Sequence, residues 1–364
     1  LTDKLTIIRS VDCRGSNHQP NTVMQTGFRA AAPRANREGA MYPAMGSLVG
    51  KLRGANDPAL PPYVVLNHID RTHFAWGGWL GKQHDPFVGD KVDRLLQLPA
   101  GLSLERLRER RTLSRQIESI QRHLDQHGNM AALDSFNQGA YDLIFGQKAK
   151  TAWDVSREPQ KIIDAYGKHA WAQKALLARR LVEAGVEIIT SELSGPLCGR
   201  VSNWDDHAVN HHIFDALKFR MPTYDQAVTA LIEDIHERGL DKQVLVCVSG
   251  EFGRTPRISR VASSGGGVAS GAKGTVQPGR DHWPRAFTNL WAGGGIETGG
   301  IIGSSDKRGE DSITRRTGAR DFMATLYHHL GIDAANGFMK DFQGNPVPIM
   351  PSPGKPVPEL MGKA

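Results

Sequence analysis

The chain has 364 residues, of which 39% are hydrophobic and 23% charged. It can therefore bury a substantial core without the help of disulfide bonds, and its composition is not that of a disordered protein. No apolar run reaches the roughly 18 residues that a membrane-spanning helix needs, so no transmembrane segment is predicted. A net charge of +7 would attract phosphate or sulfate esters, although solvated helix faces explain it equally well, and no nucleic-acid-binding signature is present.

Short apolar runs rich in β-branched residues and bounded by turn residues predict strands along the chain. Their hydrophobicity is continuous rather than alternating, which suits strands buried on both faces of a sheet and favours parallel pairing. The predicted strands are Leu5–Ile8, Tyr63–Leu66, Val186–Thr190, Val244–Val248 and Phe287–Trp291.

Two helices are predicted directly ahead of two of these strands. The first carries Leu176 and Leu181 and ends near Gly185, just before the strand at 186–190. The second ends at Gly239 and has an apolar stripe at three- and four-residue steps. Two helix-to-strand units in series indicate an α/β doubly wound sheet. The stripe consists of Leu217, Met221, Tyr224, Val228, Leu231 and Ile235.

A charged region between Leu104 and Gly146 has apolar residues at helical spacing, including Leu113, Ile117 and Leu124. No strand pattern interrupts it, so a helical insertion is predicted at about 103–147. The chain shows no internal repeat and no clean linker. We therefore predict a single α/β domain over residues 1–364.

The segment NWDDH at 203–207 follows a predicted strand, and open α/β sheets bind ligands beyond the carboxyl ends of their strands. Asp205 and His207 offer a carboxylate oxygen and an imidazole nitrogen, a pairing suited to zinc, manganese or iron. The alternative is an aspartate that caps the next helix beside a surface histidine. His211 and His212 are predicted to be bystanders.

The segment SGEFGRTP at 249–256 begins where the apolar run VLVCV ends. Glu251 could supply a metal ligand there, and Arg254 could bind an anion through two parallel hydrogen bonds. The alternative is an ion pair between Glu251 and Arg254 that stabilises a tight turn.

The segment GRDHWP at 279–284 precedes the predicted strand at 287–291. Asp281 and His282 form another adjacent pair of carboxylate and imidazole, with Arg280 beside them. The alternative is a core histidine, His282, packed against Trp283.

Together, WDDH, GEFGRTP, GRDHWP and LWAGGGIETGGIIGSSD resemble the signature blocks of a bacterial family, the sulfatase-like domain-of-unknown-function 1501 family of the alkaline phosphatase superfamily. The blocks LTIIRS, GWLGKQHDPF, YGKHAWAQKALLARRLVEAGVEII and DFMATLYHHLGI agree, so the resemblance covers nearly the whole chain. It implies an alkaline-phosphatase-like doubly wound sheet covered by helices on both faces.

The resemblance also implies a two-metal site at which a serine, threonine or modified cysteine attacks phosphorus or sulfur. Asp205 and His207 would lie on its metal loop, Glu251 would follow the central strand, and His282 would be the late metal histidine. Phe252 replaces an expected second-metal histidine, which implies that one metal is lost or held differently.

At the position where the resemblance implies a nucleophile, the chain has Asn17 and His18. His18 is therefore predicted to be a metal ligand, a phosphoryl acceptor or a general acid, with a hydrogen-bonded loop histidine as the alternative. The resemblance further implies an export leader and a first strand with a metal aspartate, which would precede Leu1, and places the protein in the periplasm or at the cell surface.

These observations predict a metal-dependent hydrolase of sulfate or phosphate esters, acting on an anionic small-molecule or saccharide ester. The rival prediction is an exported binding or scaffold protein that keeps the fold without catalysis. Zinc is the expected metal, with calcium, magnesium and manganese as alternatives. The predicted metal ligands are Asp205, His207, Glu251, Asp281 and His282; Arg254 and Arg280 would bind the substrate, and His18 and Arg254 would be catalytic.

Overall fold

The computed structural model describes most of the chain outside the region from 93 to 145. The predicted helical insertion lies almost wholly outside the described residues, as does His18. The described residues are 1–14, 24–27, 42–66, 76–89, 92, 103, 105–106, 109, 112, 146–193, 204–265, 269–341, 343–350 and 354–361.

The central sheet has four strands in the order β11 (Ile301–Ile302), β1 (Leu5–Val11), β10 (Phe287–Gly293) and β5 (Leu245–Val248). Strand β10 is antiparallel to both of its neighbours, whereas β1 and β11 are parallel. The predicted parallel pairing is therefore wrong for β10. Continuous hydrophobicity reports burial on both faces of a strand and is silent on the direction of its partner.

A second sheet has three parallel strands in the order β3 (Phe87–Val88), β2 (Tyr63–Val65) and β4 (Ile188–Thr190). With these two sheets all five predicted strands are confirmed, with ends shifted by a few residues. Two-stranded ribbons complete the sheets: β6 (Gly253–Arg254) with β9 (His282–Trp283), β7 (Ser259–Ala262) with β8 (Val276–Gly279), β12 (Ser304–Ser305) with β13 (Ser312–Thr314), and β14 (Phe338–Lys340) with β15 (Pro346–Pro348).

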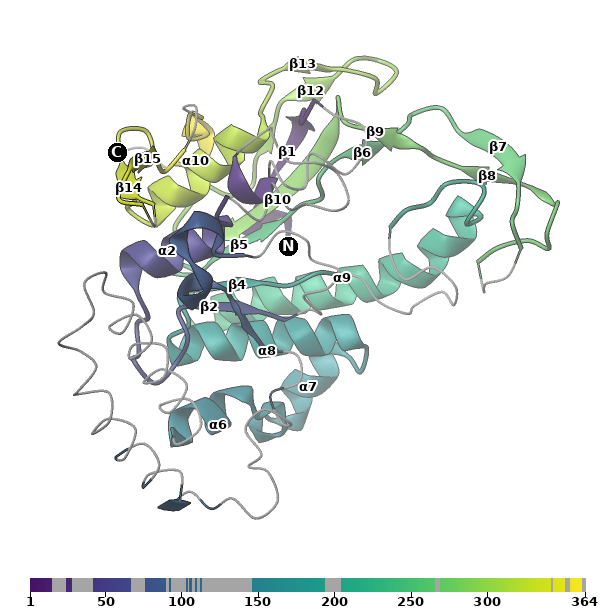
Figure 1. Cartoon of the computed structure of the whole chain (residues 1–364). Helices are drawn as coiled ribbons and strands as arrows, with labels where there is room; N and C mark the ends of the chain where they lie inside the picture. The colour runs from purple at the N-terminus through teal and green to yellow at the C-terminus, as the bar shows by residue number, and fades with distance from the viewer. Residues whose placement is uncertain are drawn as a thin grey trace.

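Helices cover both faces of the central sheet (Figure 1). On one face, Ile8 and Trp291 pack with α2 (Met45–Arg53) and α10 (Ala319–His329). On the other face, the alternate residues Ile7 and Leu290 pack with Val228 of α9 (Ile213–Glu237). The protein is thus a mixed α/β structure with several small sheets, and the doubly wound arrangement stays a prediction. The remaining helices are α6 (Gln147–Trp153), α7 (Gln160–Tyr166) and α8 (Ala170–Ala184), with 3-10 turns at Thr2–Lys4, Gly78–Leu80, Lys82–His84, Val155–Arg157 and Pro358–Leu360.

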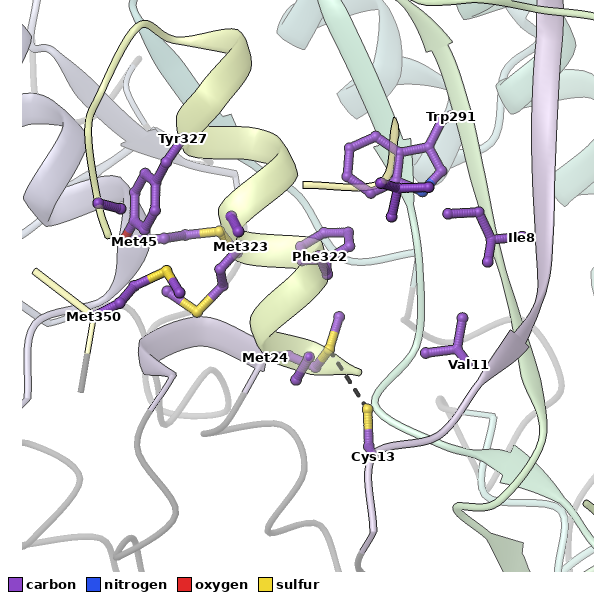
Figure 2. Close-up of a cluster of buried hydrophobic side chains, with 14 of the residues drawn as sticks. Ile8, Val11, Cys13, Met24, Met45, Trp291, Phe322, Met323, Tyr327 and Met350 are labelled. Atoms are coloured by element: carbon purple, nitrogen blue, oxygen red, sulfur yellow. Dashed lines mark hydrogen bonds between the residues drawn. The ribbon is translucent and has the colours of Figure 1, made fainter. Parts of the chain in front are cut away.

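The core between the sheet and α10 is rich in sulfur (Figure 2). Trp291 packs against Phe322 with ring centroids 5.0 Å apart, and both side chains are buried. Each large apolar side chain that is fully buried contributes about 1.5–3 kcal/mol. Burial, with the charges of nearby Asp12 and Glu251, raises the pKa of Cys13 to about 12, so this residue stays a thiol. Its Sγ lies 3.7 Å from Met24 Sδ.

Helix α9 confirms the predicted stripe in its C-terminal half, where Val228 and Ile235 are buried. Met221, by contrast, is 37% exposed, because the N-terminal half of the helix extends beyond the central sheet towards β8 (Figure 1). The predicted ends are confirmed at Gly239 and Gly185, which adopt positive φ angles of 67° and 116°. This conformation suits glycine because it has no Cβ.

Helix α9 is held against α8 by a buried ion-pair network. The Arg179 guanidinium donates to Asp234 at 2.7 Å and pairs with Glu158 at 2.8 Å, and all three side chains are almost fully buried. Tyr166 of α7 donates to the same Asp234 carboxylate at 3.0 Å. The network fixes the position of the helix that anchors the site described below. Within the described part of the chain, every helix is too short or too polar to cross a bilayer.

Candidate metal centre

Three segments that are far apart in the sequence meet at one point of the structure. The first is the loop ahead of α9, which carries Asp205 and His207. The other two are β6 and β9, whose antiparallel pairing sets Arg254 opposite His282. The backbone N–H of Thr255 donates to the carbonyl of Asp281 at 2.8 Å and extends this pairing. Three of the predicted site segments are thereby brought together.

Asp205, His207 and His282 converge through one atom each. Asp205 Oδ1 lies 2.8 Å from His282 Nε2 and 2.9 Å from His207 Nε2, and the two Nε2 atoms are 3.1 Å apart. Among the described residues this is the one group of three or more metal-ligating side chains whose atoms lie within 4.8 Å of one another. We refer to these three residues as the triad.

The triad fits a tetrahedral zinc ion. Bonds of about 2.0–2.2 Å to oxygen and nitrogen at tetrahedral angles place ligand atoms about 3.3 Å apart. The observed separations of 2.8, 2.9 and 3.1 Å need to widen by only a few tenths of an ångström. Three protein ligands with a fourth position left for solvent is the pattern of catalytic zinc, whereas structural sites use four protein ligands.

The charge on Asp205 is set by its neighbours. Burial alone would raise its pKa, but hydrogen bonds from His282 and from Arg254 Nη2, the latter at 2.8 Å, outweigh burial. The pKa of Asp205 is held well below its usual range. The carboxylate is consequently ionised at neutral pH, as a metal ligand must be.

Asp281 lies outside the triad and contacts one of its members, His207. Its Oδ1 is 2.7 Å from Nδ1 of His207, the ring nitrogen opposite the one that joins the triad. A carboxylate at this position accepts the Nδ1–H, which fixes the tautomer with a lone pair on Nε2 and makes the imidazole a stronger ligand. Direct metal ligation by Asp281 stays a prediction, while the geometry is that of an orienting partner.

Asp281→Asn is expected to weaken zinc affinity by about 10- to 100-fold, the usual effect of losing a carboxylate that hydrogen-bonds to a metal ligand. The amide keeps the shape of the side chain but presents a weaker acceptor to His207. Competition with a fluorescent zinc chelator measures the change. Asp164→Asn is the matched control because Asp164 is exposed on α7 and pairs with Gln160, away from the triad. Equal zinc affinity in the Asp281 variant and the wild type would contradict the orienting role.

A buried cluster anchors the loop that presents Asp205 and His207. Between them, the Asp206 carboxylate pairs with Arg220 of α9 and lies 3.0 Å from His211 Nδ1. His211 is fully buried, and its status as a bystander to the metal site stays a prediction. Behind the loop, a Cβ at Gly279 would come within 2.0 Å of the Ala208 backbone nitrogen, so only glycine fits there.

Sequence reasoning missed this cluster, although one signal was available. Arg220 follows Ala216 by four residues and Ile213 by seven, so it lies on the buried stripe of α9 where a charged residue needs a buried partner. That partner is Asp206. A buried arginine on an apolar stripe was the available indication of this partner.

The two arginines predicted to bind substrate make contacts within the protein. Arg254 pairs with Asp205 and also donates to the carbonyl of Arg280 at 3.3 Å. Arg280 donates through Nε to the carbonyl of Thr255 at 2.5 Å and through Nη2 to that of Arg254 at 3.0 Å. These bonds brace the β6–β9 ribbon, so Arg280 stabilises the strand that carries His282. Their binding of substrate stays a prediction.

The predicted ligand Glu251 also lies outside the triad. Glu251 is half-buried in the turn after β5, and its charge contributes to the raised pKa of Cys13. The adjacent Phe252 packs its ring on His282 with centroids 4.2 Å apart, in the place where the resemblance implied a further metal histidine. His18 lies outside the described residues. Roles for Glu251 and His18 stay predictions.

Comparison with known proteins places the chain in a family without placing it in a functional class. Neither the curated proteins nor the solved structures contain a match to it. The sulfatase-like character and the alkaline phosphatase superfamily therefore stay predictions from the resemblance. The model of one family matches residues 1–361, and the chain belongs to that family, described as "Protein of unknown function (DUF1501)".

Proposed function

We propose that this protein is a metal-dependent hydrolase of sulfate or phosphate esters, with zinc as its metal. The observation that carries the proposal is the convergence of Asp205, His207 and His282 from separate segments onto one point. Two imidazoles and one carboxylate suit zinc, and three protein ligands leave a position for solvent or substrate.

The surroundings of the triad support a reactive site. The side chains are 21%, 25% and 12% exposed, so solvent and a small substrate can reach them. A bound zinc ion would act as a Lewis acid. It would also lower the pKa of a water molecule bound to it to about 7, so that hydroxide is available at neutral pH. In this proposal Asp281 holds the His207 ring in its metal-binding tautomer, and Arg254 places a positive charge beside the point where negative charge develops.

A specific observation favours a second candidate, a binding or scaffold protein without catalysis. Asp205 Oδ1 already receives hydrogen bonds from His282 and Arg254, so its charge is compensated by protein groups alone. In that case the three segments would be joined by an ordinary ion-pair network. The exported location implied by the family resemblance is compatible with either candidate.

Metal analysis combined with an activity assay tests the proposal. We expect purified protein to contain about one zinc per chain, and to hydrolyse 4-nitrophenyl sulfate or 4-nitrophenyl phosphate. Chelation should abolish turnover, and added zinc should restore it, with manganese, magnesium and calcium as comparisons. Folded protein that takes up none of these metals and turns over neither ester would favour the scaffold.

A further inference from the structure

A pocket of about 530 Å³ opens beside the triad and shares His282 with it. Its most prominent feature is a set of three arginines from different segments: Arg14 follows β1, Arg285 follows β9 and Arg316 follows β13. The other described residues of the lining are Asp12, Trp283, Pro284 and Asp311.

The arginines surround a buried carboxylate. The Asp12 side chain is only 6% exposed, and its Oδ2 lies 3.6 Å from Arg316 Nη1 and 3.9 Å from Arg14 Nε. Arg285 Nη1 lies 3.5 Å from Asp311 Oδ2. All three separations exceed the roughly 2.7–2.9 Å of a charge-assisted hydrogen bond. The carboxylates thus hold the guanidinium groups loosely. Arg316 Nη2 also donates to the carbonyl of Ser312 at 2.9 Å, and the remaining N–H donors are left for another acceptor.

The rim of the pocket is accessible. The side chains of Arg14, Arg285 and Arg316 are 65%, 57% and 48% exposed, while Asp12 lies beneath them. Three arginines against two aspartates leave the lining with a net positive charge, before His282 is counted. A bound oxyanion would neutralise this excess positive charge. Planar guanidinium groups bind such anions through pairs of hydrogen bonds.

Backbone strain marks the same place. Arg14 has φ of 46° and Arg315 has φ of 48°, and they are the two non-glycine residues with positive φ in the described part of the chain. Arg14 lines the pocket, and Arg315 directly precedes Arg316. This conformation costs of order 1–3 kcal/mol for a residue with a Cβ and is concentrated at ligand-binding sites. Both strained positions present a pocket arginine.

We propose that this pocket binds a second anionic group, a sulfate, phosphate or carboxylate, on the substrate whose ester lies at the triad. The inference rests on the proposed function for the reacting ester, and it narrows the substrates to esters that carry at least two anions. Because His282 lines both sites, one small molecule can span them.

The test compares two sulfonates that cannot be hydrolysed, 1,3-benzenedisulfonate and benzenesulfonate, by isothermal titration calorimetry of the zinc-loaded protein. We expect the disulfonate to bind at least 10-fold more tightly. Arg316→Gln and Arg285→Gln should each reduce that preference to less than 3-fold. Arg260→Gln is the matched control, because Arg260 is exposed on β7 and does not line the pocket.

Equal affinity for the two probes in the wild type, or an unchanged preference in both pocket variants, would overturn the inference. Repeating the titration after chelation separates it from the proposed function. A preference that depends on the arginines in a protein that takes up no zinc would sustain the anion pocket and reject the metal-dependent hydrolase. Thermal unfolding of each variant shows whether a loss of binding reflects a loss of folding.

Discussion

Replacement of His282 by alanine is expected to abolish zinc binding and ester hydrolysis together. His282 Nε2 lies 2.8 Å from Asp205 Oδ1 and 3.1 Å from His207 Nε2, so its loss leaves only two ligands. The loss of zinc affinity should exceed roughly 100-fold, which is the largest loss expected when a residue that only orients a ligand, such as Asp281, is replaced. Zinc content after dialysis and turnover of aryl esters are the measurements.

His328→Ala is the matched control for this variant. His328 is exposed on α10 and takes no part in the triad, so zinc content and turnover should equal those of the wild type. Circular dichroism shows whether the His282 variant is folded. A folded His282→Ala protein that keeps its zinc would remove the triad as the metal site.

Arg220→Met is expected to destabilise the protein by about 3–5 kcal/mol, the cost of removing one partner of a buried ion pair. Arg220 is 2% exposed and pairs with the Asp206 carboxylate, which is 4% exposed, and its guanidinium also lies over the Trp204 ring at 4.9 Å. Methionine keeps much of the side-chain volume but removes the guanidinium group that pairs with the buried Asp206 carboxylate. Urea denaturation measures the free energy of unfolding.

Lys218→Met provides the comparison on the same helix. Lys218 is 78% exposed and pairs with exposed Asp215, so its replacement should change the free energy of unfolding by no more than about 0.5 kcal/mol. The Arg220 variant should also lose zinc affinity, because the Asp206 anchor lies between two triad residues. A loss of stability no larger than that of Lys218→Met would show that the pair is not a structural anchor.

The positions of the strands could be predicted from the sequence, but their directions could not. Apolar runs such as 244–248 and 287–291 report burial, which local composition determines. Whether β10 runs parallel or antiparallel to β1 depends on the path of the connecting chain, and its hydrophobicity is the same either way. Helix ends were predictable at Gly185 and Gly239 because a positive φ selects for glycine.

The triad could be predicted in part. Asp205, His207 and His282 stood out because acids and imidazoles lie near the ends of predicted buried strands, where ligands collect. The sequence could not show which atoms meet. The pairing of Arg254 with Asp205 and the placement of Asp281 behind His207 depend on contacts across 49 and 74 residues. No local pattern specifies such contacts.

The central sheet joins the first strand of the chain to strands far along the sequence. Thr6 Oγ1 donates to the carbonyl of Glu297, 291 residues further on, and β1 lies between β10 and β11. During synthesis β1 therefore leaves the ribosome long before either neighbour exists. Contacts between residues so far apart in sequence form slowly. Until they form, the backbone groups along both edges of β1 are unpaired, which favours aggregation. Production of this protein should accordingly benefit from slow translation and chaperones, and fragments that end before β10 should be insoluble.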